Sequence, residues 1–271
     1  KFQLWYRASF QPFALGYAES VDGRHWTKPK LGLVQFGGTK QNNIIDVKLG
    51  LAYSFSCFID PHEKDPAHKY KCCWGHPRKI RACLGYSADG IRWQPYNNGE
   101  PVTWRAADTH SNMVWDEDAQ VYRLFTRTDY QRFTRARMEV RGHRTMTNPD
   151  IKRNPSQWKL GRNWYFNRTP GEYKRRQVYS MTDWIYAGVH FGLITLFEHP
   201  GDLSEGPRDF QKRHERDLLA FYIATSRDAI NWDFQWVYKK QPFVPRGPSG
   251  SFDKDEIIPP ANIITYRDRH W

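Results

Sequence analysis

A seven-residue phrase recurs three times in this chain and restricts the folds that the chain can adopt. It reads SVDGRHW from Ser20, SADGIRW from Ser87 and SRDAINW from Ser226. A Ser or Asp side chain accepts hydrogen bonds from turn amides, Gly supplies a positive φ, and the following Trp enters the next strand. The phrase therefore predicts the same hairpin corner at three distant places, and its aspartates are expected to be structural.

The spacing of the tryptophans that end these phrases indicates a repeat. Trp26, Trp93 and Trp232 end the three copies, and NPSQW, which ends at Trp158, is interpreted as a degenerate fourth copy. Alternating strands such as HKYKCCWG precede the copies, and no long capped helix interrupts the pattern. Repeated four-stranded sheets around an axis are typical of a β-propeller.

We therefore predict an all-β fold, a single five-bladed β-propeller domain with four-stranded antiparallel blades, the first and last of which are incomplete. The predicted units span residues 1–36, 37–103, 104–176, 177–247 and 248–271. A sandwich and a solenoid are the alternatives, and the propeller is preferred because each repeat supplies a complete sheet. Aromatic residues, 16% of the chain, suit pleated sheets and sugar-stacking surfaces.

The charge balance favours anionic partners. The chain carries 41 Lys and Arg against 29 Asp and Glu, a formal net charge of +12. Acidic polysaccharide, nucleic acid and a membrane surface all fit this excess. Much of it lies between Arg123 and Arg176, where a solvated loop face and an anion-binding patch remain equal alternatives. No apolar run approaches the ~18 residues that a membrane span needs.

The four cysteines, Cys57, Cys72, Cys73 and Cys83, show no zinc-finger spacing. We expect buried thiols on neighbouring strands, with one disulfide left open for an exported protein. No metal-binding residues and no cofactor are predicted, although a structural calcium ion at the propeller axis is left open.

Three longer stretches resemble the five-bladed propellers of the glycosidase clan that contains glycoside hydrolase families 32, 43 and 130, in particular a bacterial-type branch. They read GYAESVDGRHWTKPKLGLVQFGGTKQNNII, ADTHSNMVWDEDAQVYRLF, and LLAFYIATSRDAINW followed by PFVPRGPSGSFD. The resemblance implies an axial funnel in which carboxylates near the starts of inner strands perform acid/base catalysis. A carboxyl separation of about 5 Å favours retention and about 6.5 to 9.5 Å favours inversion, which the sequence leaves open.

The candidate catalytic carboxylates are Asp108, Asp253 and Glu256. Asp108 stands at the predicted start of the third unit's inner strand, and His110, a candidate substrate ligand, shares its strand face. Asp253 matches the GSFD phrase of the resembling group, and Glu256 is the longer proton donor in the same cluster. Neighbouring carboxylates push each other's pKa values apart, as acid catalysis requires. A turn or solvated loop is the alternative role for each.

Four further residues are candidate substrate ligands. Asn42 and Asn43 match paired asparagines of the resembling propellers, and their amides suit sugar hydroxyls. Asp183 and Trp184 stand together in YSMTDWIYAG as a polar anchor and a stacking platform, with a buried aromatic as the alternative. Asp65, in a Lys-Asp-Pro phrase, is interpreted chiefly as part of an outer turn.

The sequence thus predicts a secreted or periplasmic carbohydrate-active enzyme, a glycoside hydrolase that acts on a polysaccharide or oligosaccharide, acidic or sulfated. A phosphorylase is less favoured. The alternative from another class is a non-catalytic propeller that serves as a glycan-binding or scaffold subunit with an anionic partner. Nucleic acid is disfavoured as a partner but is left open by the basic charge. Converging carboxylates in the funnel would favour the enzyme, and a plugged funnel would favour the alternative.

Overall fold

The fold is built almost entirely from β-strands. The structure, a computed structural model, describes residues 1–46, 49–51, 54–76, 78–79, 81–104, 111–129, 141–198 and 218–271. Within these ranges the helical elements are one short α-helix and three single turns of 3₁₀-helix: α2 (Gln235–Tyr238), η1 (Pro66–His68), η2 (Asn97–Gly99) and η3 (Glu172–Lys174).

The strands form four antiparallel sheets, called blades here, and one hairpin. Blade 1 contains β1 (Phe2–Phe10), β2 (Phe13–Ser20) and β3 (Ile44–Asp46). Blade 2 contains β4 (Ser56–Ile59), β5 (Tyr70–Gly75), β6 (Ala82–Ser87) and β7 (Gln94–Pro95). Blade 3 contains β8 (Asn112–Asp116), β9 (Val121–Asp129), β10 (Arg141–Asn148) and β11 (Lys159–Trp164). Blade 4 contains β12 (Arg176–Tyr186), β13 (Val189–Glu198), β14 (Leu219–Ser226) and β15 (Trp232–Asp233). The hairpin consists of β16 (Thr265–Tyr266) and β17 (Arg269–His270).

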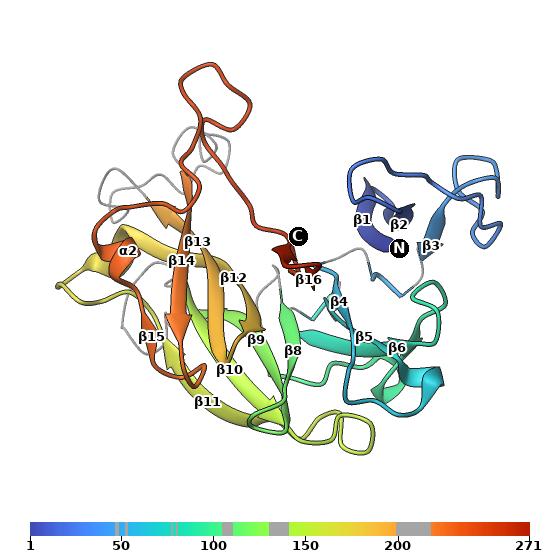
Figure 1. Cartoon of the computed structure of the whole chain (residues 1–271), viewed down its shortest axis with the longest axis horizontal. Coiled ribbons are helices and arrows are strands. Elements are labelled where there is room, and N and C mark those ends of the chain that lie inside the picture. Colours follow the sequence, from blue (N-terminus) through green and yellow to red (C-terminus); the bar gives the residue numbers. More distant parts are fainter. Residues whose placement is uncertain are drawn as a thin grey trace.

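The molecule is an all-β propeller with four blades, so the prediction of five blades is wrong. Figure 1 shows the four sheets set side by side around a centre near which β16 lies. Residues 248–271, expected to begin a fifth blade, supply only the short hairpin β16–β17. Pro259 and Pro260 interrupt this segment, and proline cannot donate a backbone hydrogen bond to a strand ladder.

The hydrophobic core is divided among the spaces between neighbouring blades. One cluster joins blades 1 and 2, a second joins blades 2 and 3, and a third joins blades 3 and 4. Successive residues of a strand point to opposite faces, so Cys72 packs toward blade 1 while Cys73 packs toward blade 3. Burial on both faces explains why β5 reads as a continuous buried run.

The four cysteines are free, buried thiols on the adjacent strands β4, β5 and β6, as the sequence predicted. Burial raises the pKa of the Cys73 and Cys83 thiols to about 12. The thiolate is the reactive form, so these groups are inert near neutral pH.

All three copies of the repeated phrase form the predicted turn, but Trp26, unlike Trp232, does not enter a strand and is exposed. Ser20 Oγ accepts hydrogen bonds from two turn amides at 2.8 and 3.2 Å, and Asp22 Oδ1 accepts from the next two at 2.8 and 2.9 Å. Asp89 Oδ1 accepts from two amides at 2.8 Å, and Asp228 Oδ1 does so at 2.7 and 2.8 Å. The corners follow β2, β6 and β14, so the structural role predicted for these aspartates is confirmed.

A fourth corner follows β10 and uses asparagine where the other three use serine. Asn148 Oδ1 accepts a hydrogen bond from the Asp150 amide at 2.8 Å, and Asp150 Oδ1 accepts from two later amides at 3.0 and 3.2 Å. Trp158 Nε1 donates to the carbonyl three residues earlier, as Trp93 Nε1 does in blade 2. Trp158 therefore marks a repeat, and the Asn-Pro-Asp sequence before it was the missed signal.

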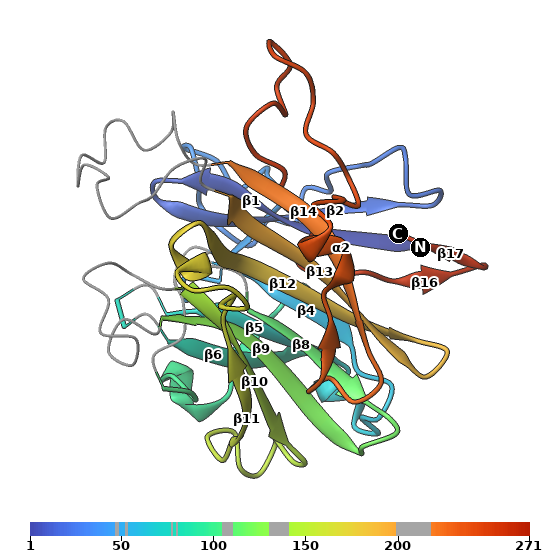
Figure 2. The same ribbon diagram turned by 90° about the vertical axis from the view of Figure 1, so that its left-hand side faces the viewer.

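The hairpin β16–β17 lies between blade 4 and blade 1. The His270 ring contacts Tyr186 at 4.7 Å between ring centroids, and the Tyr266 and Trp271 rings contact Phe2 at 5.5 and 4.9 Å. Figure 2 shows the hairpin near both ends of the chain. Aromatic contacts therefore connect the last blade to the first.

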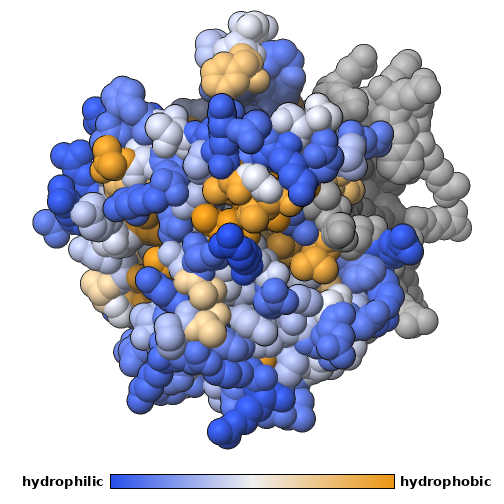
Figure 3. Space-filling model, turned by 90° about the vertical axis from the view of Figure 1, so that its right-hand side faces the viewer, coloured by the Kyte–Doolittle hydropathy of each residue, from blue (hydrophilic) through white to orange (hydrophobic). Residues whose placement is uncertain are grey.

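The side of the molecule that carries blades 1 and 2 is mainly hydrophilic, with hydrophobic side chains gathered near its centre (Figure 3). In the part of the chain that the structure describes, no helix is both long and apolar enough to cross a membrane.

Candidate functional site

Asp108 and His110 lie outside the described residues. In the sequence they stand just before β8, which begins at Asn112. Because blade 3 is antiparallel, the start of β8, the end of β9 and the start of β10 lie at the same end of the sheet. We call this end of blades 3 and 4 the entrance end, since the segment that carries Asp108 leads into it.

Basic and aromatic side chains gather at the entrance end. The Arg127 guanidinium lies 5.7 Å from the centroid of the Tyr179 ring on β12, and Arg141 lies 4.6 Å from the Phe197 ring on β13. The two rings contact each other edge to face at 5.2 Å. Cation–π attraction holds each guanidinium over its ring. The Arg-rich segment was visible in the sequence, but the rings were not, because they come from another blade.

The neighbouring His143 is neutral. Full burial lowers the pKa of His143 to about 3, because a charged imidazole is disfavoured away from water. The positive charge at this end therefore comes from arginine at any pH near neutrality.

The Asn42 side chain binds its own loop, and the Asn43 side chain binds β1 and β2. Asn42 Nδ2 donates to two loop carbonyls at 2.8 and 2.9 Å. Asn43 Nδ2 donates to Tyr6 Oη and to the Tyr17 carbonyl, both at 2.7 Å. Both amides thus position the loop that leads into β3, and binding of a sugar by them stays a prediction.

Asp253 and Glu256 lie, in the sequence, just before the segment that contacts the inner strands of blades 2, 3 and 4. Glu256 forms a parallel bridge with Leu219, whose amide donates to the Asp255 carbonyl at 2.9 Å. The Gly247 amide donates to the Asp253 carbonyl at 3.2 Å and closes the loop between them. Leu219 begins β14, which is separated from the first strand of its blade, β12, by β13. The structure places Glu256 beside β14, and the catalytic roles of both carboxylates stay a prediction.

Asp183 and Trp184 occupy opposite faces of β12. Asp183 points toward blade 3, and His190 Nδ1, on the neighbouring strand β13 of blade 4, lies 3.1 Å from its Oδ2. Trp184 stacks on Phe191 at 5.1 Å and belongs to a cluster that the segment around Ile257 covers. Both side chains are buried, so the structure does not bring them to one binding surface.

A buried chain of charged groups connects blades 3 and 4 through His190. His190 Nε2 lies 3.5 Å from Asp116 Oδ2, and Arg123 Nε donates to the same oxygen. Burial disfavours the ionised form of Asp116, but the Arg123 hydrogen bond, a backbone amide and the nearby positive charges outweigh it and lower its pKa. Sequence reasoning missed this cluster, because its members come from four different strands.

Burial has the opposite net effect on Asp183. It raises the pKa of this carboxyl from 3.8 to about 6, against the opposing hydrogen bond and charge of His190. Asp183 Oδ1 has no hydrogen-bond partner among the described residues. A general acid needs a raised pKa, but a fully buried carboxyl does not contact a polysaccharide, so Asp183 fits a positioning role.

The segment from Pro260 to Asn262 ties together the first strands of blades 2, 3 and 4. The Ala261 carbonyl accepts hydrogen bonds from Ser56 Oγ on β4 at 3.0 Å and from Asn112 Nδ2 on β8 at 3.1 Å. Thr182 Oγ1 on β12 donates to the Pro260 carbonyl at 2.7 Å. We call these contacts the axial tie, and they place backbone between three inner strands.

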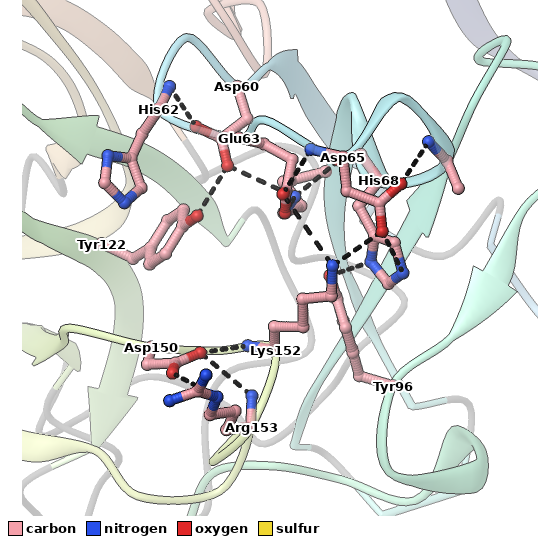
Figure 4. Close-up of polar contacts among 12 residues, drawn as sticks. Asp60, His62, Glu63, Asp65, His68, Tyr96, Tyr122, Asp150, Lys152 and Arg153 are labelled. Carbon is pink, nitrogen blue, oxygen red and sulfur yellow. Dashed lines mark hydrogen bonds and ion pairs between the residues drawn. The ribbon is translucent and has the colours of Figure 1, made fainter.

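A second polar cluster lies between blades 2 and 3 (Figure 4). The fully buried Lys71 Nζ lies 3.3 Å from Asp60 Oδ2 and 2.8 Å from Glu63 Oε2. Tyr122 Oη, from blade 3, donates to Asp60 Oδ2 at 2.6 Å. Lys152, from the corner after β10, completes the cluster through Asp65 Oδ2 at 2.8 Å.

The electrostatics of this cluster suit a clamp between blades. Burial disfavours ionised Glu63, but hydrogen bonds from Lys71 and the Asp65 amide more than compensate and lower its pKa. The hydrogen bond from Lys152 lowers the pKa of Asp65. Both carboxylates are therefore ionised at neutral pH and do not meet the requirement for a general acid. In the described part of the chain, no group of His, Cys, Asp and Glu side chains has a metal-binding arrangement.

Comparison with protein-family models found no match, and neither did comparison with curated proteins. Among solved structures, a putative glycoside hydrolase from Parabacteroides distasonis overlaps 95% of this chain and 73% of its own, with a TM-score of 0.56 and 12% identity. A structure described as a glycoside hydrolase overlaps 94% of this chain and 72% of its own, with a TM-score of 0.52 and 11% identity. At these identities the likeness shows that this chain shares their fold.

Proposed function

We propose that this protein is a glycoside hydrolase that cleaves a polysaccharide or oligosaccharide by paired-carboxylate acid/base catalysis. The observation that carries the proposal is the overlap of nearly the whole chain with the Parabacteroides distasonis structure described as a putative glycoside hydrolase. Because fold alone does not determine function, the argument also needs chemistry at the entrance end. A secreted or periplasmic location suits such an enzyme, and the reaction requires no cofactor.

Asp108 is the leading catalytic carboxylate in this proposal. It stands four positions before the first residue of β8, which leads into the same end of blade 3 as Arg127 and Arg141. Arg127 is buried, so Arg141 is the guanidinium that can bind carboxylate or sulfate groups through charge-assisted hydrogen bonds, and rings such as Tyr179 suit sugar faces. An acidic or sulfated glycan is therefore the preferred substrate class.

The test measures the release of reducing sugar from neutral and acidic polysaccharides, with and without phosphate. We expect Asp108→Asn to lower kcat by about 10²- to 10⁴-fold, the usual contribution of a general acid or base. Asp253→Asn and Glu256→Gln are tested in parallel, because one of them is expected to supply the second carboxylate. Asp118→Asn, at an exposed turn, is the matched control and retains activity.

A result against the proposal is a folded wild-type chain that releases no sugar from any member of the panel. Release that strictly requires phosphate would instead identify a phosphorylase. Equal activity of the Asp108 and Asp118 variants would remove Asp108 from the catalytic set.

The second candidate function is a non-catalytic glycan-binding or scaffold subunit. The axial tie favours it, because backbone at Ala261 lies between inner strands where the enzyme proposal places a substrate funnel. Binding of an acidic glycan without cleavage, undiminished in Asp108→Asn, would select this candidate over the hydrolase.

A further inference from the structure

The outer rim of blades 3 and 4 is built from two segments that aromatic side chains hold together. Trp164, at the end of β11, contacts Phe234 at 4.6 Å between ring centroids. Phe166 contacts Phe234 at 5.3 Å and Tyr238, in α2, at 6.1 Å. Phe166 is almost fully buried. Figure 2 looks onto this side of the molecule. The surface above these rings is therefore a fixed junction rather than two independent loops.

Five exposed cations lie on this junction, and we call them the basic rim. They are Arg162, Arg168, Arg227, Lys239 and Lys240. Arg162 is held across the two blades by a hydrogen bond from its Nη1 to Asn231 Oδ1 at 3.0 Å. The Arg168 guanidinium lies 4.6 Å from the centroid of the Tyr238 ring. Tyr238 directly precedes Lys239 and Lys240 in the chain.

The acidic groups of the same area are engaged locally. Asp228 accepts hydrogen bonds from the amides of its own corner. Glu172 accepts from the Arg168 amide at 2.7 Å and lies 3.7 Å from Arg176. Asp233 accepts from the first amide of α2 at 2.9 Å. The carboxylates thus stabilise turns, and the outward charge of the rim is positive.

One aromatic ring stands exposed among these cations. Trp236 of α2 is 41% exposed, whereas the Tyr238 ring lies beneath Arg168. Single-stranded nucleic acid is held by several rings that stack on successive bases. A rim with many cations and one exposed ring better fits a polymer whose charge repeats along the chain while only an occasional ring face stacks.

We propose that the basic rim and Trp236 form a second binding site, for an anionic polysaccharide, separate from the entrance end. The choice of a glycan rests on the proposed function. Carboxylate and sulfate groups share the chemistry that guanidinium and ammonium groups recognise. The site would hold a long substrate on the outside of blades 3 and 4 while another part of the same polymer reaches the entrance end.

The test measures affinity of the full chain for fluorescently labelled heparin and polygalacturonate, which separate sulfate from carboxylate recognition. Lys239→Ser combined with Lys240→Asn is expected to weaken the preferred polymer about tenfold, through loss of charge-assisted contacts. Lys30→Ser combined with Lys40→Ser removes the same charge from exposed positions between β2 and β3 and is expected to change affinity less than twofold. Trp236→Ala is expected to weaken the same polymer about threefold.

Equal losses in the rim and control variants would overturn the proposal, as would tighter binding of a single-stranded DNA 20-mer than of either polysaccharide. Cleavage of a small chromogenic glycoside is followed in parallel and is expected to be unchanged in the rim variants. Absence of cleavage in every variant counts against the proposed hydrolase alone, because the binding comparison still decides the rim.

Discussion

Asp183 combines full burial with contacts to charged groups from neighbouring strands, and this combination controls how it titrates. Its carboxyl binds a proton more tightly in the folded protein, with a pKa of about 6, than in the unfolded chain, where the ordinary value is 3.8. The folded state therefore gains stability as pH falls from about 7 toward 4, and it loses that contribution as pH rises through about 6.

We predict that Asp183→Asn removes this pH dependence. At pH 7.5 the wild type carries a buried carboxylate that the variant lacks, and the pKa difference corresponds to about 3 kcal/mol. Between pH 4.5 and 7.5, the variant's free energy of unfolding should therefore rise relative to that of the wild type by about 2 kcal/mol, because the unfolded carboxyl is already largely ionised at pH 4.5. Urea unfolding across this range measures the difference. A difference that does not change with pH contradicts the prediction, and Asp118→Asn serves as the exposed control.

The turns that follow β2, β6, β10 and β14 share one hydrogen-bonding pattern. In each, a side-chain oxygen at the end of a strand accepts an amide hydrogen bond, and an aspartate two residues later accepts two more. This arrangement resembles an N-cap, because it satisfies backbone donors that no strand pairs with. Asp150 accepts from the amides two and three residues later, as Asp89 does, although the sequence of its corner looks different.

We predict that Asp150→Ala and Asp89→Ala destabilise the protein to a similar extent, about 1 kcal/mol each, the usual cost of losing a capping side chain. Asp118→Ala, at a turn outside the repeat, should cost less than about 0.5 kcal/mol. Thermal or urea unfolding of the three variants provides the measurement. If Asp150→Ala behaves like Asp118→Ala, the corner after β10 is not equivalent to the others.

Two sets of long-range contacts connect the segment from Ile257 to Trp271 with all four blades. The axial tie joins this segment to the inner strands of three blades, and the hairpin that follows joins blade 4 to blade 1. Asn112 is central to the tie, since it donates to the Ala261 carbonyl while its Oδ1 accepts from the Asp183 amide at 3.0 Å.

We predict that Asn112→Ala destabilises the axial tie and the part of β12 that contacts Asn112. The substitution leaves the buried Asp183 amide without its partner and removes one of the two hydrogen bonds that the Ala261 carbonyl accepts, at a cost of about 1 to 3 kcal/mol. Amide hydrogen exchange in residues 257–264 should accelerate together with exchange in β12, because both lose the same anchor. Asn167→Ala, at an exposed position, is the control and should leave both unchanged. Faster exchange at only one of the two sites would show that the tie does not couple them.

The repeated corners and the alternation of apolar residues are local properties, so four features could be predicted from the residues alone: the all-β class, the repeat, the structural role of Asp22, Asp89 and Asp228, and the burial of the cysteines. The number of blades was not local information. It depended on whether residues 248–271 form the strands of a fifth sheet. Pro259 and Pro260 interrupt this segment, which forms only the short hairpin β16–β17. The pairing of Asp183 with His190, and of Arg127 with Tyr179, likewise arose only when strands far apart in the chain packed together, because burial and neighbouring charge, not residue type, give these side chains their chemistry.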